Sequence, residues 1–458
     1  MGRGLLRFDL PVAAEVAGLT GPATSIHRLV GRPPVESTAT VIDTADHRLL
    51  SWGLELSRVA ETGRWTLRAA GWEPLLNAER TMPQAEDDIP QEFAGLLVPF
   101  RRGGILGPSL EVASVRRRFT LTDESGRPFG DLTDERVRIG HHPGQLRAFR
   151  CVTLQTPDEL EPDIRDAVVA AFAAAGGTRV KNLPTLATRL GLTSHADRGA
   201  RLSARTPIED FVSAHLQARW RGLLRADLAV RTTGRDDAEL RAGVRLLRQE
   251  LAALGPLLTA DWLGSARRLL DAALADPRTL QNTERWLRIL DLLADGVAEP
   301  PLLPHVAGRI TGPVLAQEIE AVVRTMRDQC RTLDPYSDDV RWVQAHEVAN
   351  RAWALSTLSC DVFGKPARRL RKRLTAIATA LHRTVRPEPS SLARDLHDLT
   401  ATEIFEAGRA YERAMLSVDY AREQFLREWP LLWDNLRARV IRPRVPHQRA
   451  PLTEAVVP

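Results

Sequence analysis

The sequence predicts an α+β protein in which antiparallel strands come first and helices follow. Two patterns along the chain carry this prediction. Up to about residue 190, short segments alternate between apolar and polar side chains, which is typical of half-buried strands. From about residue 206, apolar residues recur every three or four positions, which is typical of helices. We therefore expect a strand-rich domain over residues 1–190, a linker over 191–205, an all-helical domain over 206–440 in two halves divided near 297–313, and a disordered tail over 441–458.

Length and composition are those of an ordinary globular protein. The chain has 458 residues, 43% of them hydrophobic, which is enough to build packed cores in two or three domains. Cys151, Cys330 and Cys360 are far apart and odd in number, so neither a disulfide framework nor a tetrahedral zinc site is indicated. Because the chain has no clean signal peptide and no apolar run of about 18 residues, we expect a cytoplasmic protein without membrane contact.

Arginine carries almost all of the positive charge. The formal net charge is +5, and lysine occurs only at positions 181, 365 and 372. Phosphate binding and a biased genome composition both produce an excess of arginine, and composition alone leaves the two explanations open.

The first expected elements are a strand, a short helix and a hairpin. Residues 4–10 predict the strand and residues 12–19, which follow a proline, predict the helix. The hairpin is predicted over residues 54–68, because apolar and polar side chains alternate on both sides of a Glu-Thr-Gly turn at residues 61–63.

Residues 73–110 are rich in proline and predict turns with one short helix near residues 92–98. A strand over residues 115–122, a turn at 123–126 and a partner strand ending near Val137 follow. Another strand is expected over residues 149–155, and then an amphipathic helix over 158–175 with acidic residues in its first turn and two glycines at its end.

The segment over residues 43–54 suggests a family. Asp43-Thr44-Ala45-Asp46, followed by Arg48-Leu49-Leu50 and Gly53-Leu54, resembles the second-strand signature of the CYTH, or triphosphate tunnel, family. Members of that family hydrolyse or cyclise triphosphate compounds with magnesium or manganese inside an antiparallel barrel. The resemblance therefore implies a β-barrel or tunnel over residues 1–190.

The same resemblance implies a set of phosphate-binding cations. They stand where the family carries inward-pointing arginines and lysines on its strands, or a Ser-Lys pair near its end. In this chain the implied ligands are Arg7, Arg58, Arg68, Arg116, Arg118, Arg150 and Lys181.

The metal-binding carboxylates of the family are missing. Its first strand has glutamates where this chain has Arg3 and Leu5, and a later strand has glutamates where this chain has Cys151, Thr153 and Gln155. Since magnesium and manganese prefer oxygen ligands that include carboxylates, we expect neither metal unless Glu79, Asp134 or Glu135 replaces the lost ligands.

The helical half contains a helix with two stripes. Over residues 236–254, arginines at positions 241, 245 and 248 run beside an apolar stripe. The segment resembles a helix of the CHAD domain, an α-helical domain that often follows CYTH and resembles polyphosphate-binding modules. The resemblance implies that Arg241, Arg245 and Arg248 bind phosphate, whereas a solvated stripe paired with acids remains the plain alternative. The apolar stripe consists of Leu240, Val244, Leu247, Leu251 and Leu254.

The densest basic cluster lies over residues 365–373. On a helix, its five cations fall on one face, and no acidic residue occurs between Asp361 and Glu388. Such a face favours contact with a polyanion over a simply solvated surface, because the cations otherwise repel one another. The cluster consists of Lys365, Arg368, Arg369, Lys372 and Arg373.

The sequence therefore predicts a degenerate CYTH–CHAD protein that binds inorganic polyphosphate, or another polyanion that contains triphosphate, without turnover. A metal-dependent phosphatase acting on inorganic triphosphate or polyphosphate is the alternative. Nonspecific binding of nucleic acid is a weaker one, because few aromatic residues accompany the basic cluster. The sequence identifies no protein partner.

Overall fold

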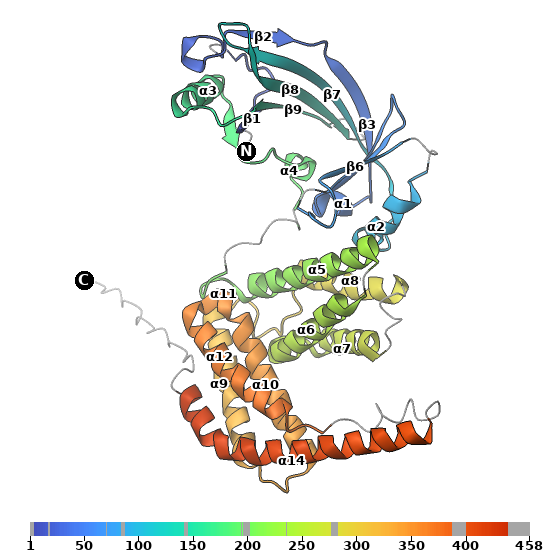
Figure 1. Cartoon of the computed structure of the whole chain (residues 1–458), viewed down its shortest axis with the longest axis vertical. Helices are drawn as coiled ribbons and strands as arrows, with labels where there is room; N and C mark the ends of the chain where they lie inside the picture. Colours follow the sequence, from blue (N-terminus) through green and yellow to red (C-terminus); the bar gives the residue numbers. More distant parts are fainter. Residues whose placement is uncertain are drawn as a thin grey trace, which may run out of the picture. The chain divides into compact units, whose positions relative to one another are not determined.

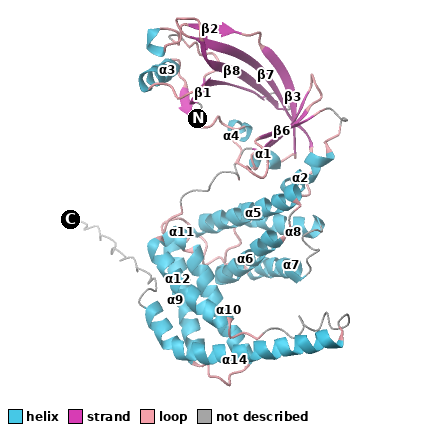
Figure 2. Ribbon diagram, in the orientation of Figure 1, coloured by secondary structure: helices cyan, strands magenta, loops and turns pink. Residues whose placement is uncertain are grey.

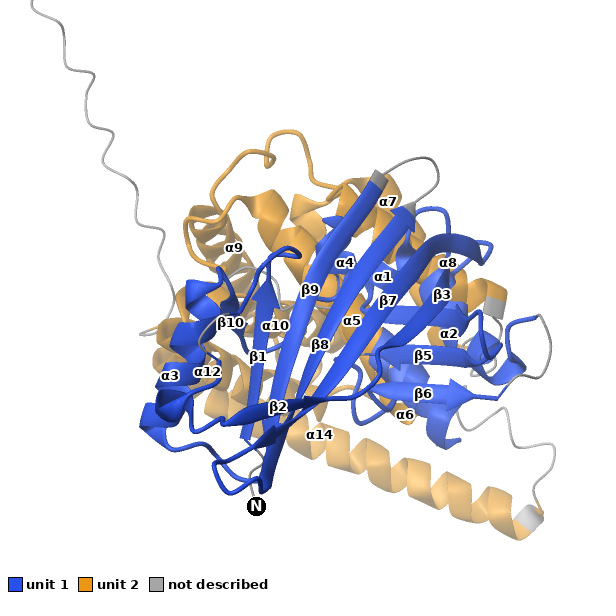
Figure 3. Ribbon diagram, turned by 90° about the horizontal axis from the view of Figure 1, so that it is seen from above, with its two compact units in different colours: residues 1–198, 224–237 blue, residues 199–223, 238–458 orange. Residues whose placement is uncertain are grey.

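The computed structural model describes residues 4–16, 19–69, 71–83, 88–141, 145–193, 195, 202–234, 236–275, 283–386 and 400–437. The chain divides into two compact units (Figure 3), each described here by itself. The first comprises Met1–Arg198 with Leu224–Asp237, and the second comprises Gly199–Leu223 with Ala238–Pro458. The expected linker lies partly outside the described residues, and the expected disordered tail lies wholly outside them.

One antiparallel sheet of ten strands dominates the described part of the first unit (Figure 2). Its order is β10-β1-β9-β8-β7-β3-β4-β5-β6, and β2 pairs with β7 beside this path. The bounds are β1 Gly4–Leu10, β2 Arg28–Gly31, β3 Val35–Asp43, β4 Leu54–Val59, β5 Trp65–Ala69, β6 Glu79–Met82, β7 Gly107–Thr122, β8 Pro128–His141, β9 Gln145–Thr156 and β10 Thr178–Val180.

The sheet is curved but open (Figure 1). The pairings of the described residues run from β10 at one edge to β6 at the other and do not join these edges. The predicted α+β class is confirmed, whereas these pairings do not form the closed barrel that the family resemblance implies. Both edge strands are short, with three residues in β10 and four in β6, so little backbone is left for closure by hydrogen bonds.

Most of the predicted elements of this unit are present. The hairpin is β4 and β5, and the helices near residues 92–98 and 158–175 are α2 (Gln91–Arg101) and α3 (Pro162–Ala174). The helix predicted over residues 12–19 is wrong, because the described part of that segment is turn, bend and irregular chain. Ala14 and Val16 pack instead against the core of the sheet, and this contact overrides local helix propensity.

The motif at residues 43–46 has a structural role. Asp43 is buried, and its carboxylate accepts backbone hydrogen bonds from Thr44, Leu49 and Leu50 at 2.7, 2.9 and 3.0 Å. It therefore holds the first turn of α1 (Arg48–Ser51) against the end of β3. The residues that carry the family resemblance thus shape the connection between β3 and β4.

Helices cover both faces of the sheet. On one face, Leu6, Phe8 and Leu154 form a core with Val168 and Phe172 of α3. On the other, Val41, Val137 and Ile139 pack against Leu186 and Ala187 of α4 (Leu186–Leu190). The α4 side is the side on which the polar residues discussed below are found.

The second unit is helical in its described part, and the unit boundary divides α5. The predicted apolar stripe of α6 is confirmed, since all five of its residues are buried. Of the described helices, none combines the length and apolar character needed to cross a lipid bilayer. The helices are α5 Ile208–Thr233, α6 Ala238–Leu254, α7 Ala260–Ala275, α8 Thr283–Ala298, α9 Thr311–Arg331, α10 Asp339–Leu358, α11 Cys360–Phe363, α12 Lys365–His382 and α14 Ala401–Arg437.

Candidate anion-binding surfaces

Three transverse rows of mainly polar side chains lie on one face of β1, β9, β8 and β7. Residues directly paired in antiparallel strands point to the same side of a sheet, so the strand register defines each row. Cys151, Thr153 and Gln155 of β9, which stand where the family has glutamates, share this face. The rows, called the polar rows below, are Asp9–Cys151–Glu135–Arg116, Arg7–Thr153–Thr133–Arg118 and Leu5–Gln155–Asp131–Thr120.

Salt bridges and hydrogen bonds neutralise much of the charge in the polar rows. Arg116 Nη2 lies 2.8 Å from Glu135 Oε1, and Arg189 Nη2 of α4 lies 2.5 Å from Asp9 Oδ1. Arg7 donates to the carbonyl oxygen of Lys181 at 2.8 Å. Within the described residues, Arg118 is exposed and forms no ion pair, so it is the most available cation of this face.

Cys151 lies in the first polar row between Asp9 and Glu135. Its side chain is 7% exposed, and Arg189 Nη2 is 3.7 Å from its sulfur. Burial raises the pKa of the Cys151 thiol above its ordinary value, despite the opposing effect of Arg189. A protonated, buried thiol is a poor nucleophile, which agrees with a structural role for this residue.

The described carboxylates of this unit do not form a ligand set for magnesium or manganese. Asp9 and Glu135 are paired with arginines, and Asp131 accepts a hydrogen bond from Thr120 at 3.2 Å. Over the described ranges, no three His, Cys, Asp or Glu side chains gather as a metal site would require. The carboxylates that the structure describes therefore do not fit the metal that the CYTH resemblance implies.

Two of the carboxylates that could replace the missing metal ligands already form salt bridges. Asp134 lies on the opposite face of the sheet and forms a two-pronged salt bridge with Arg150. Glu79 pairs with Arg68 at the far end of the sheet. Arg3, at a position where the family has glutamate, lies outside the described residues.

The structure separates several of the cations that the resemblance groups together. Arg150 is 8% exposed and points away from the polar rows toward Asp134 and the carbonyl oxygen of Ala14. Arg150 therefore does not share the face on which Arg7, Arg116 and Arg118 lie. Its position next to Cys151 explains the difference, because successive residues of a strand point to opposite faces.

The two hairpin arginines lie on opposite faces of β4 and β5. Arg58 pairs in register with Trp65, and its guanidinium carbon is 6.0 Å from the centre of that ring. Arg68 pairs in register with Glu55 and forms salt bridges with Glu55 and Glu79, at 2.7 and 3.0 Å. The two arginines therefore cannot both face one lumen.

In the second unit, α12 carries the predicted cationic face. All five predicted cations are exposed, while Leu370, Leu374 and Ile377 are buried on the other side of the helix. None of the five forms an ion pair within the described part of the chain. The residues, called the α12 cationic face below, are Lys365, Arg368, Arg369, Lys372 and Arg373.

The arginine stripe of α6 is less available. Arg248 forms a salt bridge with Asp271 of α7, and Arg241 is half-buried. Arg245 is exposed. The stripe therefore agrees better with a surface partly paired with acids than with a second anion site.

Sequence reasoning missed Asp9 and Arg189. Asp9 could have been found, because it stands two residues after Arg7 on the same strand and so shares its face. Arg189 gives no such signal, since only the packing of α4 brings it within reach of β1.

Comparisons with known proteins add little. No family model matches the chain, and no curated protein matches it. Among solved structures, the chain is similar to a candidate adenylyl cyclase from Hippeastrum described as having a dominant triphosphatase activity. The two are 13% identical over 42% of this chain and 97% of that chain, with a TM-score of 0.21. Similarity at this level carries no argument about fold or activity.

Proposed function

We propose that this protein binds inorganic polyphosphate, or a similar linear polyanion, through the α12 cationic face. One observation carries the proposal. Five exposed cations occupy one side of a helix over nine residues, and no ion pair is formed by any of them within the described residues. At about 1.5 Å of rise per residue, they span roughly 12 Å along the helix axis.

The position of the cluster at the start of α12 strengthens the argument. The first turn of a helix carries a partial positive charge, and Asp or Glu is stabilising there. The first turn of α12 contains no acidic residue and begins with Lys365. Helix dipole and side chains therefore add positive charge at the same place, and a bound polyanion would relieve this repulsion.

Polyphosphate matches this surface chemically. It presents repeated negative charges and many acceptor oxygens, and guanidinium groups bind phosphate through paired hydrogen bonds. Because the cations are exposed, we expect binding to be sensitive to salt. We further propose that the chain is a degenerate CYTH–CHAD protein that does not turn its ligand over, since Asp9, Asp134 and Glu135 are each paired with an arginine.

The test is a binding measurement that also follows released phosphate. Long-chain polyphosphate and tripolyphosphate are each incubated with the protein, with and without magnesium or manganese. We expect saturable, salt-sensitive binding without release of phosphate. Metal-stimulated release at catalytic protein concentrations would instead support a phosphatase, and preferential binding of single-stranded RNA would support a nucleic-acid partner.

A triple variant locates the site. Lys365→Ala, Arg369→Ala and Lys372→Ala together should weaken polyphosphate binding by at least tenfold and flatten its salt dependence. The control is Arg288→Ala, Arg324→Ala and Arg427→Ala, which removes the same charge from exposed arginines that are paired with glutamates. Equal affinities for the two variants would contradict the assignment.

A further inference from the structure

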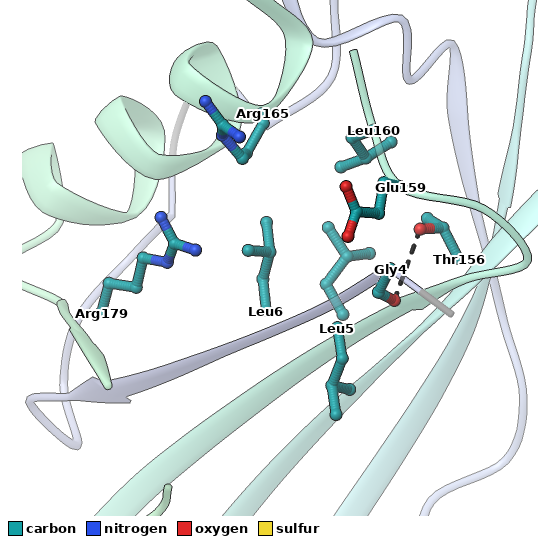
Figure 4. Close-up of a pocket in the computed structure, with 9 residues that line it drawn as sticks. Gly4, Leu5, Leu6, Thr156, Glu159, Leu160, Arg165 and Arg179 are labelled. Carbon is teal, nitrogen blue, oxygen red and sulfur yellow. Dashed lines mark hydrogen bonds between the residues drawn. The ribbon is translucent and has the colours of Figure 1, made fainter. Parts of the chain in front are cut away.

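A cavity of about 220 Å³ lies in the first unit, where β1 begins and β9 ends (Figure 4). It is bordered by these strands, the loop that leads to α3, α3 itself and β10. It is separate from the α12 cationic face, which belongs to the other unit. Its lining includes Leu6, Leu154, Glu159, Leu160, Arg165 and Arg179.

Close backbone contacts shape this cavity. A Cβ atom on Gly4 would lie 2.2 Å from Thr156 Oγ1 and 2.4 Å from the carbonyl oxygen of Asp158, so only glycine fits there. Thr156 is buried, and its hydroxyl donates to the carbonyl oxygen of Asp158 at 2.6 Å. The same hydroxyl also lies 3.4 Å from the carbonyl oxygen of Gly4, so the loop that carries Glu159 and Leu160 is tied to the start of β1.

The cavity has an apolar floor and charges of both signs around it. Leu6 and Leu154 are buried, and Leu160 is partly buried against the same core. Figure 4 shows the guanidinium groups of Arg165 and Arg179 on one side of Leu6 and the carboxylate of Glu159 on the other.

The two arginines of the cavity form at most weak salt bridges. Within the described residues, Arg179 is exposed and forms no ion pair. Arg165 pairs with Asp166 at 3.2 Å, but the Asp166 side chain is 72% exposed, so this contact is weak.

These features define the kind of ligand that fits. A simple anion would meet Glu159, and a simple cation would meet two arginines, whereas a zwitterion satisfies both signs. A cavity of about 150 Å³ can hold benzene, so this cavity has room for a branched or aromatic side chain. Ligand sites of this kind combine apolar walls with a few polar groups that fix orientation.

We propose that this cavity binds a small apolar α-amino acid. Arg179 and Arg165 receive its carboxylate, Glu159 receives its ammonium group, and the side chain rests on Leu6, Leu154 and Leu160. The site is independent of polyphosphate binding, so either proposal can fail without the other.

Calorimetric titration of the full chain tests the proposal. L-leucine and L-phenylalanine should bind saturably at millimolar concentrations. Leucinamide, which lacks the carboxylate, and N-acetyl-leucine, which lacks the ammonium group, should each bind roughly tenfold more weakly or worse. Polyphosphate should not compete. Absence of binding by both amino acids, or equal binding of leucine and its two derivatives, would overturn the proposal.

Two variants assign the charges to residues. Arg179→Gln should weaken leucine binding roughly tenfold. Glu159→Gln should weaken leucine binding similarly. It should leave the affinity for N-acetyl-leucine unchanged, because this derivative has no ammonium group that could pair with Glu159. Arg136→Gln, an exposed change on β8 outside the cavity, is the matched control and should bind as the natural protein does. Identical behaviour of Arg179→Gln and Arg136→Gln would contradict the assigned role.

Discussion

Arg150 and Asp134 form a buried, two-pronged salt bridge between neighbouring strands. Arg150 Nε donates to Asp134 Oδ1 at 2.7 Å, and Nη2 donates to Oδ2 at 2.8 Å. The side chains are only 9% and 8% exposed. The adjacent pair Arg116–Glu135 lies on the opposite face of the sheet and is more open, with side chains 38% and 27% exposed.

We expect Asp134→Ala to destabilise the first unit strongly, by about 3–5 kcal/mol, because it leaves the Arg150 charge buried without its partner. The matched control, Glu135→Ala, breaks a more exposed pair and should cost about 0–1 kcal/mol. Urea unfolding followed by circular dichroism measures both. Similar losses for the two variants would show that burial does not distinguish the two pairs.

Protonation of His346 should lower the stability of the second unit in mild acid. Asn350 Nδ2 lies 2.9 Å from His346 Nε2, and the ring of His382 lies 5.2 Å away. Burial, and then the charge of His382, lower the pKa of His346 below its ordinary value of 6.5. Because the folded-state pKa is depressed, the stabilisation from neutral His346 is present above pH 6.5 and is lost as pH falls through the folded-state pKa.

The measurement is the free energy of unfolding between about pH 7.5 and about pH 5. The free energy of unfolding of the natural protein should fall toward that of His346→Gln as pH falls, since the glutamine side chain does not titrate. His305→Gln changes an exposed histidine of the same unit and is the control. A difference that stays constant with pH would contradict a neutral, half-buried His346 in the folded protein.

An acidic residue at the start of α12 should raise the stability of the protein and weaken polyphosphate binding. Lys365→Glu places an acid in the first turn of the helix, where it complements the helix dipole. It should therefore raise the free energy of unfolding by about 0.3–1 kcal/mol at low salt while weakening polyphosphate binding. Lys372→Glu makes the same charge change two turns into the helix and should weaken binding with a smaller gain in stability. A lower free energy of unfolding in Lys365→Glu would contradict the claim that positive charges repel one another at the start of α12.

The three cysteines should resist alkylation in the folded protein. Cys151, Cys330 and Cys360 are free and buried. Burial raises the pKa of Cys330 to about 12 and raises the pKa of the other two thiols as well. Since the thiolate is the reactive form, iodoacetamide at neutral pH should label the urea-unfolded chain much faster than the folded one, as read by mass spectrometry. Rapid labelling of Cys151 in the folded protein would reopen a chemical role for it.

Much of the local structure was predictable, because it depends on short-range periodicity. The alternation around Leu54 and Leu56 identified the hairpin, and the spacing of Leu240 and Val244 identified the buried side of α6. The exposure of Lys365 and its neighbours follows from the same reasoning, since Leu370 and Leu374 occupy the opposite side of that helix. The helix expected over residues 12–19 failed where contact with the sheet outweighed local propensity.

The order of strands and helices, the alternation within each strand and the density of cations on α12 follow from the sequence alone. Three features follow only from the three-dimensional structure: the salt bridge between Arg150 and Asp134, the opposite faces of Arg58 and Arg68, and the lack of pairing between β10 and β6 in the described sheet. The tertiary structure also brought Gly4, Glu159 and Arg179 around one cavity. Periodicity constrains neighbours along the chain, whereas strand register decides which face a residue lies on, and packing joins segments that are distant in the sequence.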